Sequence, residues 1–180
     1  MGLLTQIFSR RTGTTVITAP RLVMLNLSGT KQPELLEADM GRLGPLFPGA
    51  SVVDANPPPC DVLFIYGVVG PNGTIGGHRV RELIRATGAS IVVVASENLP
   101  EPYMALARPG PGEQANLVMA LDRKGSAFSS FFEKLFGEMF AGRTMPQAWV
   151  KLAPQIPGEV HAGAPDCIFS CERPKVRLAA

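Results

Sequence analysis

Residues 61–73 read DVLFIYGVVGPNG, an apolar run that breaks into a glycine-containing turn. An apolar run without alternation is typical of a strand that is covered on both faces of a sheet. Similar runs occupy residues 21–27 (RLVMLNL), 90–95 (SIVVVA) and 115–121 (ANLVMAL), with a weaker one at 51–54. Strands of this kind belong to a parallel sheet between two layers of helices. The sequence therefore predicts a three-layer α/β sandwich with a mainly parallel sheet flanked by helices.

The segments near these runs have the spacing of amphipathic helices. Predicted helices cover 32–47, 78–88, 126–140 and 144–153. The clearest is 126–140, SAFSSFFEKLFGEMF, in which Phe, Leu and Met recur at helical spacing, and we expect this stripe to be core. Ser126 is the expected N-cap. Thr144 and Gln147 have the spacing of a capping box, which marks the start of the last helix.

Composition indicates one soluble domain. The chain has 180 residues, 46% of them hydrophobic, and a formal net charge of +2. No apolar run in the sequence reaches the ~18 residues that a membrane-spanning helix needs. Arg79, Arg81 and Arg85 are interpreted as the solvated face of one helix, so nucleic-acid binding is not favoured. We place the α/β domain at 21–153, between an N-terminal arm at 1–20 and a C-terminal extension at 154–180.

The cysteines give no reason to expect a metal or another cofactor. Cys60, Cys167 and Cys171 are odd in number, which suits a reducing compartment, and Cys167 and Cys171 lack a second pair of ligands. We therefore expect no cofactor and a cytoplasmic location. Residues 1–20 contain Arg10 and Arg11 but no acid, so the mitochondrial matrix is the alternative location if this segment acts as a targeting signal.

The order of these motifs resembles the caspase-like fold, which includes the metacaspases and the CHAT domains. Residues 62–67 (VLFIYG), a turn with Asn72 and Gly73, a helix and then 90–98 (SIVVVASEN) follow in the family's order. Residues 116–153 are similar to the strand, helix, Gly-Arg-Thr turn and Ala-rich helix of CHAT domains. The resemblance covers 21–153. It implies a flavodoxin-like strand order and a cysteine-peptidase site formed by the loops after two strands.

The catalytic positions that the resemblance implies are both substituted. The family's Gly-His-Gly falls on residues 68–70, with Val69 in place of the histidine, and its Ala-Cys falls on Ala95 and Ser96. Valine exchanges no proton, and a serine hydroxyl is a weak nucleophile unless a base lies within hydrogen-bond reach. The two imidazoles of the chain, His78 and His161, fall outside the matched positions. The chain is therefore interpreted as a degenerate relative that lacks the catalytic His and Cys.

The carboxyl ends of three predicted strands meet at one edge of the sheet, where α/β proteins bind ligands. We call this edge the crest and define it by residues 67–77, 96–98 and 122–124. The glycine-rich part at 70–77 fits an anion cradle or a tight turn, and the turn is favoured. The long loop at 101–114 is expected to open on the same edge. The candidate ligand-binding residues of the crest are Gly70, Asn72, Gly73, Ser96, Glu97, Asn98, Asp122, Arg123 and Lys124.

Two functions follow from these observations. The first is a non-catalytic binding, adaptor or structural subunit of a larger protein assembly, in which the two arms make contacts. The second is a small hydrolase or ligand-binding protein that uses Ser96 and Asp122–Lys124. A receiver-like or flavodoxin-like regulatory domain shares the strand order, but the first predicted strand ends at Asn26 and Ser28 instead of the acidic pair of a receiver. Other protein subunits are the expected partners, and the oligomeric state is left open.

Overall fold

A six-stranded sheet forms the centre of the structure, a computed structural model that describes residues 13–28, 33–70, 72–106, 108–152 and 164–180. The strand order is β3-β2-β4-β5-β6-β7. In that order the strands span Gly49–Val53, Arg21–Asn26, Val62–Tyr66, Ile91–Val94, Asn116–Asp122 and Asp166–Cys171. Neighbours from β3 to β6 are parallel, whereas β7 runs antiparallel to β6. The predicted α/β fold with a mostly parallel sheet is confirmed.

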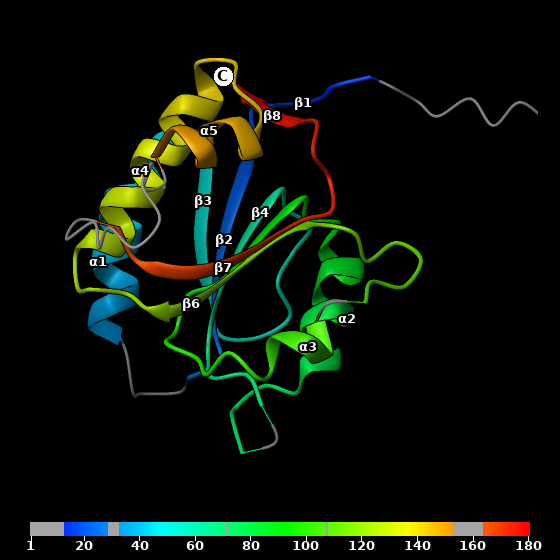
Figure 1. Cartoon of the computed structure of the whole chain (residues 1–180). Coiled ribbons are helices and arrows are strands. Elements are labelled where there is room, and N and C mark those ends of the chain that lie inside the picture. The colour runs from blue at the N-terminus through cyan, green and yellow to red at the C-terminus, as the bar shows by residue number, and fades with distance from the viewer. Residues whose placement is uncertain (1–12, 29–32, 71, 107, 153–163) are drawn as a thin grey trace, which may run out of the picture.

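Helices cover both faces of this sheet (Figure 1). On one face lie α1 (Pro33–Leu43), α4 (Ala127–Phe140) and α5 (Met145–Leu152), and on the other lie α2 (Gly77–Thr87) and the short α3 (Tyr103–Leu106). A 3-10 turn at Gly44–Leu46 follows α1. Alternate residues of β4 enter opposite clusters: Phe64 packs on the α4 side and Ile65 on the α2 side. This burial on both faces is the reason that the strands read as unbroken apolar runs.

The aromatic stripe of α4 is core, as predicted. Phe128, Phe132 and Phe136 are fully buried, and the ring of Phe64 meets that of Phe132 edge-on with 5.4 Å between centroids. Ser126 precedes the helix, but its side chain makes no capping bond because its backbone is already helical, with φ −70° and ψ −9°. The expectation that its hydroxyl caps α4 is wrong. At α5, Gln147 Oε1 accepts the Thr144 N–H at 3.0 Å, which is one of the two bonds of the predicted capping box.

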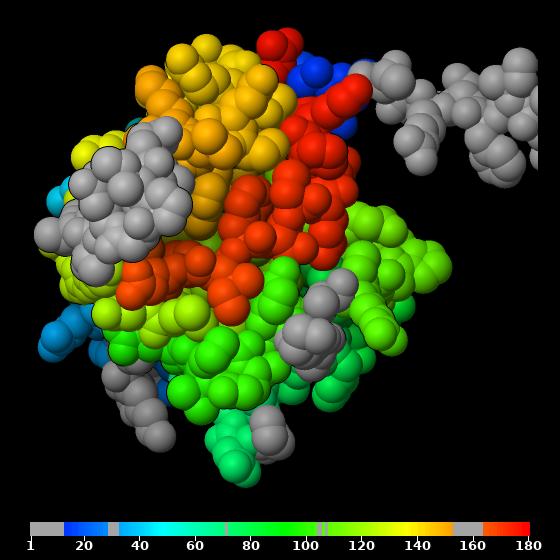
Figure 2. Space-filling view, in the orientation of Figure 1, coloured from blue at the N-terminus to red at the C-terminus, as the bar shows by residue number. Residues whose placement is uncertain are grey.

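The described parts of the two predicted arms belong to this fold. β1 (Thr15–Thr18) and β8 (Val176–Ala179) form a separate parallel pair, and Val176 and Leu178 are buried in the cluster that contains α4. β7 lies at one edge of the central sheet, and the orange and red residues of the C-terminal segment fill a continuous part of the surface in Figure 2. A domain limit at 153 therefore leaves out strands of the fold. Residues 1–12 and 153–163, with His161, lie outside the described residues.

The interpretation of Arg81 as part of a solvated helix face is wrong. Arg79 and Arg85 of α2 are exposed, but the Arg81 side chain is only 5% exposed. Its Nη2 lies 2.6 Å from Glu172 Oε1, its Nη1 donates to Glu113 O, and its Nε donates to Leu106 O. Arg81 thus joins α2 to the loop before β6 and to the residue that follows β7. Within the described ranges, no helix is long and apolar enough to cross a membrane.

Candidate functional site

The loops that follow β4, β5 and β6 meet at the crest, as the sequence predicts. Asn98, which is 6% exposed, fixes this meeting point. Its Oδ1 accepts the Val69 N–H at 2.7 Å, and its Nδ2 donates to the carbonyl oxygens of Ser96 and Ala120. One amide side chain therefore bonds to the loop after β4, to its own loop after β5 and to strand β6. Asn98 holds the crest together from within instead of presenting its amide to a ligand.

Both positions at which the sequence resemblance places catalytic residues are buried in the structure. Val69 is 2% exposed and Ser96 is 1% exposed. Val69 packs in the cluster on the α2 side of the sheet together with Ile75. An external substrate therefore does not reach the Ser96 hydroxyl unless the crest opens.

The glycine-rich part of the crest is a tight turn, as favoured by the sequence. Gly70 N–H donates to Ile75 O, Ile75 N–H donates to Val68 O, and Gly73 N–H donates to Gly70 O, all at 3.0 or 3.1 Å. A Cβ at Gly73 would lie 2.1 Å from Val68 O, so this turn requires glycine there. The amides of Gly70 and Gly73 are used within the turn and do not form an anion cradle. Asn72 is exposed at the tip of the turn.

The charged residues at and after the end of β6, together with Glu97 of the loop after β5, point to different sides of the crest. Asp122 and Glu97 are exposed, and each accepts a backbone N–H of the loop after β6: Asp122 that of Lys124 at 2.8 Å, and Glu97 that of Arg123 at 3.3 Å. The Lys124 side chain bonds to Asp166 at the start of β7 at 2.9 Å. Arg123 turns inward and is 3% exposed. The predicted Asp122–Lys124 group therefore presents Asp122 and part of Lys124 at the surface, while Arg123 is buried.

Arg123 belongs to a buried polar cluster under the crest. Its Nη2 lies 3.0 and 2.8 Å from the two carboxylate oxygens of Asp39, and its Nη1 donates to Ala95 O at 2.6 Å. Tyr66 donates its hydroxyl to Asp39 Oδ2 at 2.7 Å. The guanidinium carbon lies 3.8 Å from the centroid of the Phe128 ring, within cation–π range. We call Asp39, Tyr66 and Arg123 the buried triad, which joins α1 to β4 and to the loop after β6.

The spacing of residues in α1 indicates that one member of the buried triad, Asp39, faces the core. Asp39 lies between Leu36 and Leu43 at positions i, i+3 and i+7, so it occupies the inward face of α1. A carboxylate on an apolar helix face requires a buried partner. The sequence predicts Arg123 as a ligand-binding residue of the crest, whereas the structure buries it against Asp39. Its partner is 84 residues away in the sequence, and local patterns do not indicate such pairs.

The Tyr66 hydroxyl is expected to make the free energy of unfolding fall as the pH rises in the alkaline range. Burial, and then the charge of Asp39, hold the pKa of Tyr66 well above its usual 10.0. As pH rises past 10, tyrosine in the unfolded chain loses its proton while Tyr66 in the folded protein keeps it, so folding loses stability. We expect the free energy of unfolding, measured in urea between pH 8 and 11, to fall more steeply for the wild type than for Tyr66→Phe. Equal slopes for the wild type and Tyr66→Phe would contradict a raised pKa of Tyr66.

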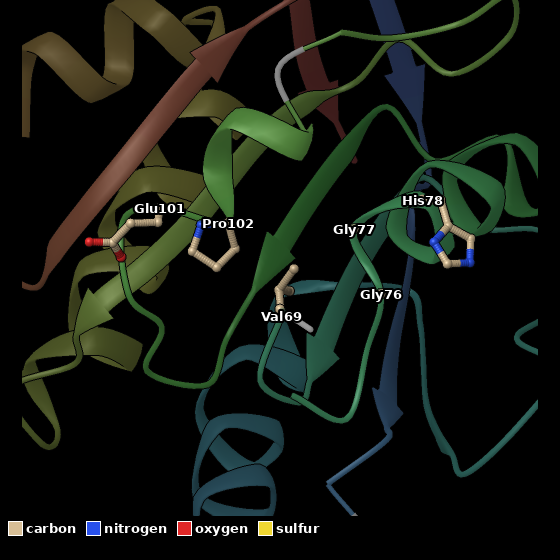
Figure 3. Close-up of a pocket in the computed structure, with 7 residues that line it drawn as sticks. Val69, Gly76, Gly77, His78, Glu101 and Pro102 are labelled. Atoms are coloured by element: carbon tan, nitrogen blue, oxygen red, sulfur yellow. The ribbon is translucent and has the colours of Figure 1, made fainter. Parts of the chain in front are cut away.

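A cleft of about 500 Å³ opens beside the crest. Figure 3 shows Val69 and Pro102 at its centre, between Glu101 on one side and Gly76, Gly77 and His78 at the start of α2 on the other. Its surface is mainly apolar. The long loop after β5 contributes Glu101 and Pro102 to the cleft, so its start lies at the crest, whereas Glu113 near its end pairs with Arg85 of α2. Among the candidates from the sequence, Val69 and Gly70 line the cleft, whereas Ser96 and Asp122–Lys124 do not.

The candidate residues of the crest thus separate into three groups. Asn98, Arg123, Gly73 and the buried Ser96 belong to the interior of the crest, Gly70 lines the cleft beside Val69, and Asn72, Glu97, Asp122 and part of Lys124 lie at the surface. His78, which falls outside the positions that the resemblance matches, is among the residues that line the cleft. Among the described residues, no group of three or more His, Cys, Asp and Glu side chains is placed to hold a metal ion.

The bonds of Asn98 give a testable effect on stability. In Asn98→Ala the Val69 N–H and the Ser96 carbonyl stay buried without their side-chain partner, and we expect the free energy of unfolding to fall by about 1–3 kcal/mol. Asn72→Ala is the matched control, because Asn72 is exposed and its loss is expected to cost less than about 0.5 kcal/mol. Urea unfolding measures both variants. Equal losses in the two would show that Asn98 does not hold the crest.

Comparison of the chain with models of known protein families, with curated proteins and with solved structures finds no match. The resemblance to the caspase-like fold therefore rests on the order of the sequence motifs alone.

Proposed function

We propose that this protein is a non-catalytic relative of the caspase-like and CHAT-domain proteins that acts as a binding, adaptor or structural subunit of a larger protein assembly. One observation carries the proposal: Ser96, at the position of the family's nucleophile, is 1% exposed and outside the cleft, while the cleft is lined by Val69 at the position of the family's base. A peptidase needs an accessible nucleophile next to a base. Here Val69 replaces the base, and Asn98 bonds the loop of Val69 to the loop of Ser96.

The cleft is the proposed contact site for the partner. Its centre is apolar, and exposed apolar side chains lie in the two loops that Asn98 joins: Val68 is 43% exposed and Leu99 is 71% exposed. Apolar groups at the centre with polar groups at the rim are the usual anatomy of a protein interface. Glu101 and His78 lie on opposite sides of the cleft, and in Figure 3 their side chains point away from Val69 and Pro102. These features support a protein surface as the ligand.

Affinity purification of the tagged full chain at low salt, followed by mass spectrometry, tests the proposal. The matched pair of variants is Glu101→Arg at the rim of the cleft and Glu37→Arg on the exposed side of α1, which change the charge equally. We expect stoichiometric partners with the wild type and with Glu37→Arg, and their loss with Glu101→Arg. Recovery of the wild-type protein alone would contradict an adaptor role.

A second candidate is a small-molecule binding protein that uses the same cleft. It is favoured by the cleft's volume and by its place at the carboxyl ends of parallel strands, where α/β proteins bind ligands. The hydrolase form of this candidate would need a substrate to reach Ser96, which is buried. A thermal-shift screen tests the ligand-binding form, because a compound that binds only the folded state raises its melting temperature. The shift should disappear in Glu101→Arg and persist in Glu37→Arg.

A further inference from the structure

The central sheet has two outer edges that differ in their protection. β7 forms one edge, and it carries features that prevent a further strand from pairing. The partner strand β6 has a bulge between Ala120 and Asp122, opposite the first residues of β7, which disturbs the pairing there. The charged Asp166, 59% exposed, begins β7.

β3 forms the other edge (Figure 1), and although Pro48 precedes it and Asp54 follows it, neither a charge nor a bulge lies within the strand. Its sequence, GASVV, contains no charge and no proline, and its register with β2 is regular from Gly49 to Val53. Ala50, Ser51 and Val52 are exposed, with Val52 at 43%. Within the described residues no strand pairs with its outer side. An unprotected edge offers backbone donors and acceptors to another strand.

We infer that β3 pairs with β3 of a second copy of this chain, antiparallel, about a two-fold axis at Ser51. The two sheets then continue into each other across the dimer. This register sets Ala50 opposite Val52 on the face of the sheet that α1 and α4 cover, since their β2 neighbours Leu22 and Met24 belong to that cluster. On the opposite face it sets Gly49 opposite Val53 and Ser51 opposite its own counterpart.

The sequence of β3 fits a second copy because it is complementary to itself. In this register each valine lies opposite glycine or alanine, and the strand has no charged side chain that could face a like charge. Isologous pairing of this kind closes after two copies, so it yields a dimer instead of a fibre. β3 itself has no charged side chain that could pair with a charged strand of another protein.

Sedimentation equilibrium of the full chain over a wide concentration range tests the dimer. The chain has a mass of 19.2 kDa, and we expect the apparent mass to rise toward twice that value with concentration. Amide hydrogen exchange at Gly49–Val53 should slow at the same concentrations, while exchange at Thr15–Thr18 stays constant. A single mass of 19.2 kDa at every concentration would overturn the inference.

Val52→Lys supplies the decisive variant, because lysine on an edge strand opposes pairing. We expect at least a tenfold weaker association, with an unchanged circular dichroism spectrum since Val52 is partly exposed. Val52→Thr keeps the branched shape and should associate like the wild type. Val16→Lys is the matched control, with Val16 at 42% exposure on β1. Association that survives Val52→Lys, or that Val16→Lys weakens equally, would contradict pairing through β3.

Discussion

Replacing Arg123 with methionine is expected to lower the free energy of unfolding by about 3–5 kcal/mol, which is the usual cost of removing one partner from a buried ion pair. The Arg123 and Asp39 side chains are 4% and 2% exposed, so the Asp39 carboxylate would stay buried with only the Tyr66 hydroxyl as partner. The Ala95 carbonyl would lose the bond from Arg123 Nη1. Urea unfolding at neutral pH measures the loss.

Two controls separate burial from charge in this result. Arg42→Met removes an exposed pair with Glu133, and we expect it to cost less than about 1 kcal/mol. The double variant Asp39→Leu with Arg123→Met removes both buried charges, and we expect it to be more stable than Arg123→Met alone. If Arg123→Met costs no more than Arg42→Met, the buried triad does not hold α1 and the crest together.

Arg81→Met is expected to produce a loss of similar size, about 3–5 kcal/mol, for the same physical reason. Glu172 is 11% exposed, and without Arg81 its carboxylate keeps the Ala115 N–H at 3.0 Å as a neutral donor. The carbonyl oxygens of Leu106 and Glu113 lose their donor too. Because Glu172 follows β7 directly, we also expect faster amide exchange in Asp166–Cys171, the strand that the sequence did not predict.

Arg79→Met provides the matched comparison on the same helix. Arg79 lies two residues before Arg81, and its pair with Glu82 joins side chains that are 51% and 42% exposed. We expect a change within about 0.5 kcal/mol. Equal effects of Arg79→Met and Arg81→Met would mean that Arg81 is solvated in solution, as the charge pattern of the sequence first indicated.

The strands of the fold were predictable where burial is continuous. β4 and β5 are buried at every position, so their sequences are uniformly apolar and need no partner to be identified. β7 and β8 lack this signal. β7 is only half-buried through most of its length, and its sequence DCIFSC contains a single pair of large apolar residues, Ile168 and Phe169. β8 is four residues long, so its alternating burial is too short to identify a strand, and its partner β1 is distant in the sequence.

The crest was predictable from topology, but the roles of its side chains were not. Parallel strands bring the loops after β4, β5 and β6 to one edge, so the meeting of residues 69, 98 and 123 follows from strand order. Whether a polar side chain at that edge points outward depends on partners elsewhere in the chain. Asp39 draws Arg123 inward, and the Val69 N–H draws in Asn98.

Incubation of the purified protein with a broad peptide library, followed by mass spectrometry of the products, tests the central claim most directly. We predict that the wild type and Ser96→Ala leave the library equally intact, because Ser96 is buried and the proposed alignment places Val69, which exchanges no proton, at the position of the base. Cleavage by the wild type that disappears in Ser96→Ala would contradict a non-catalytic role and would identify Ser96 as a nucleophile.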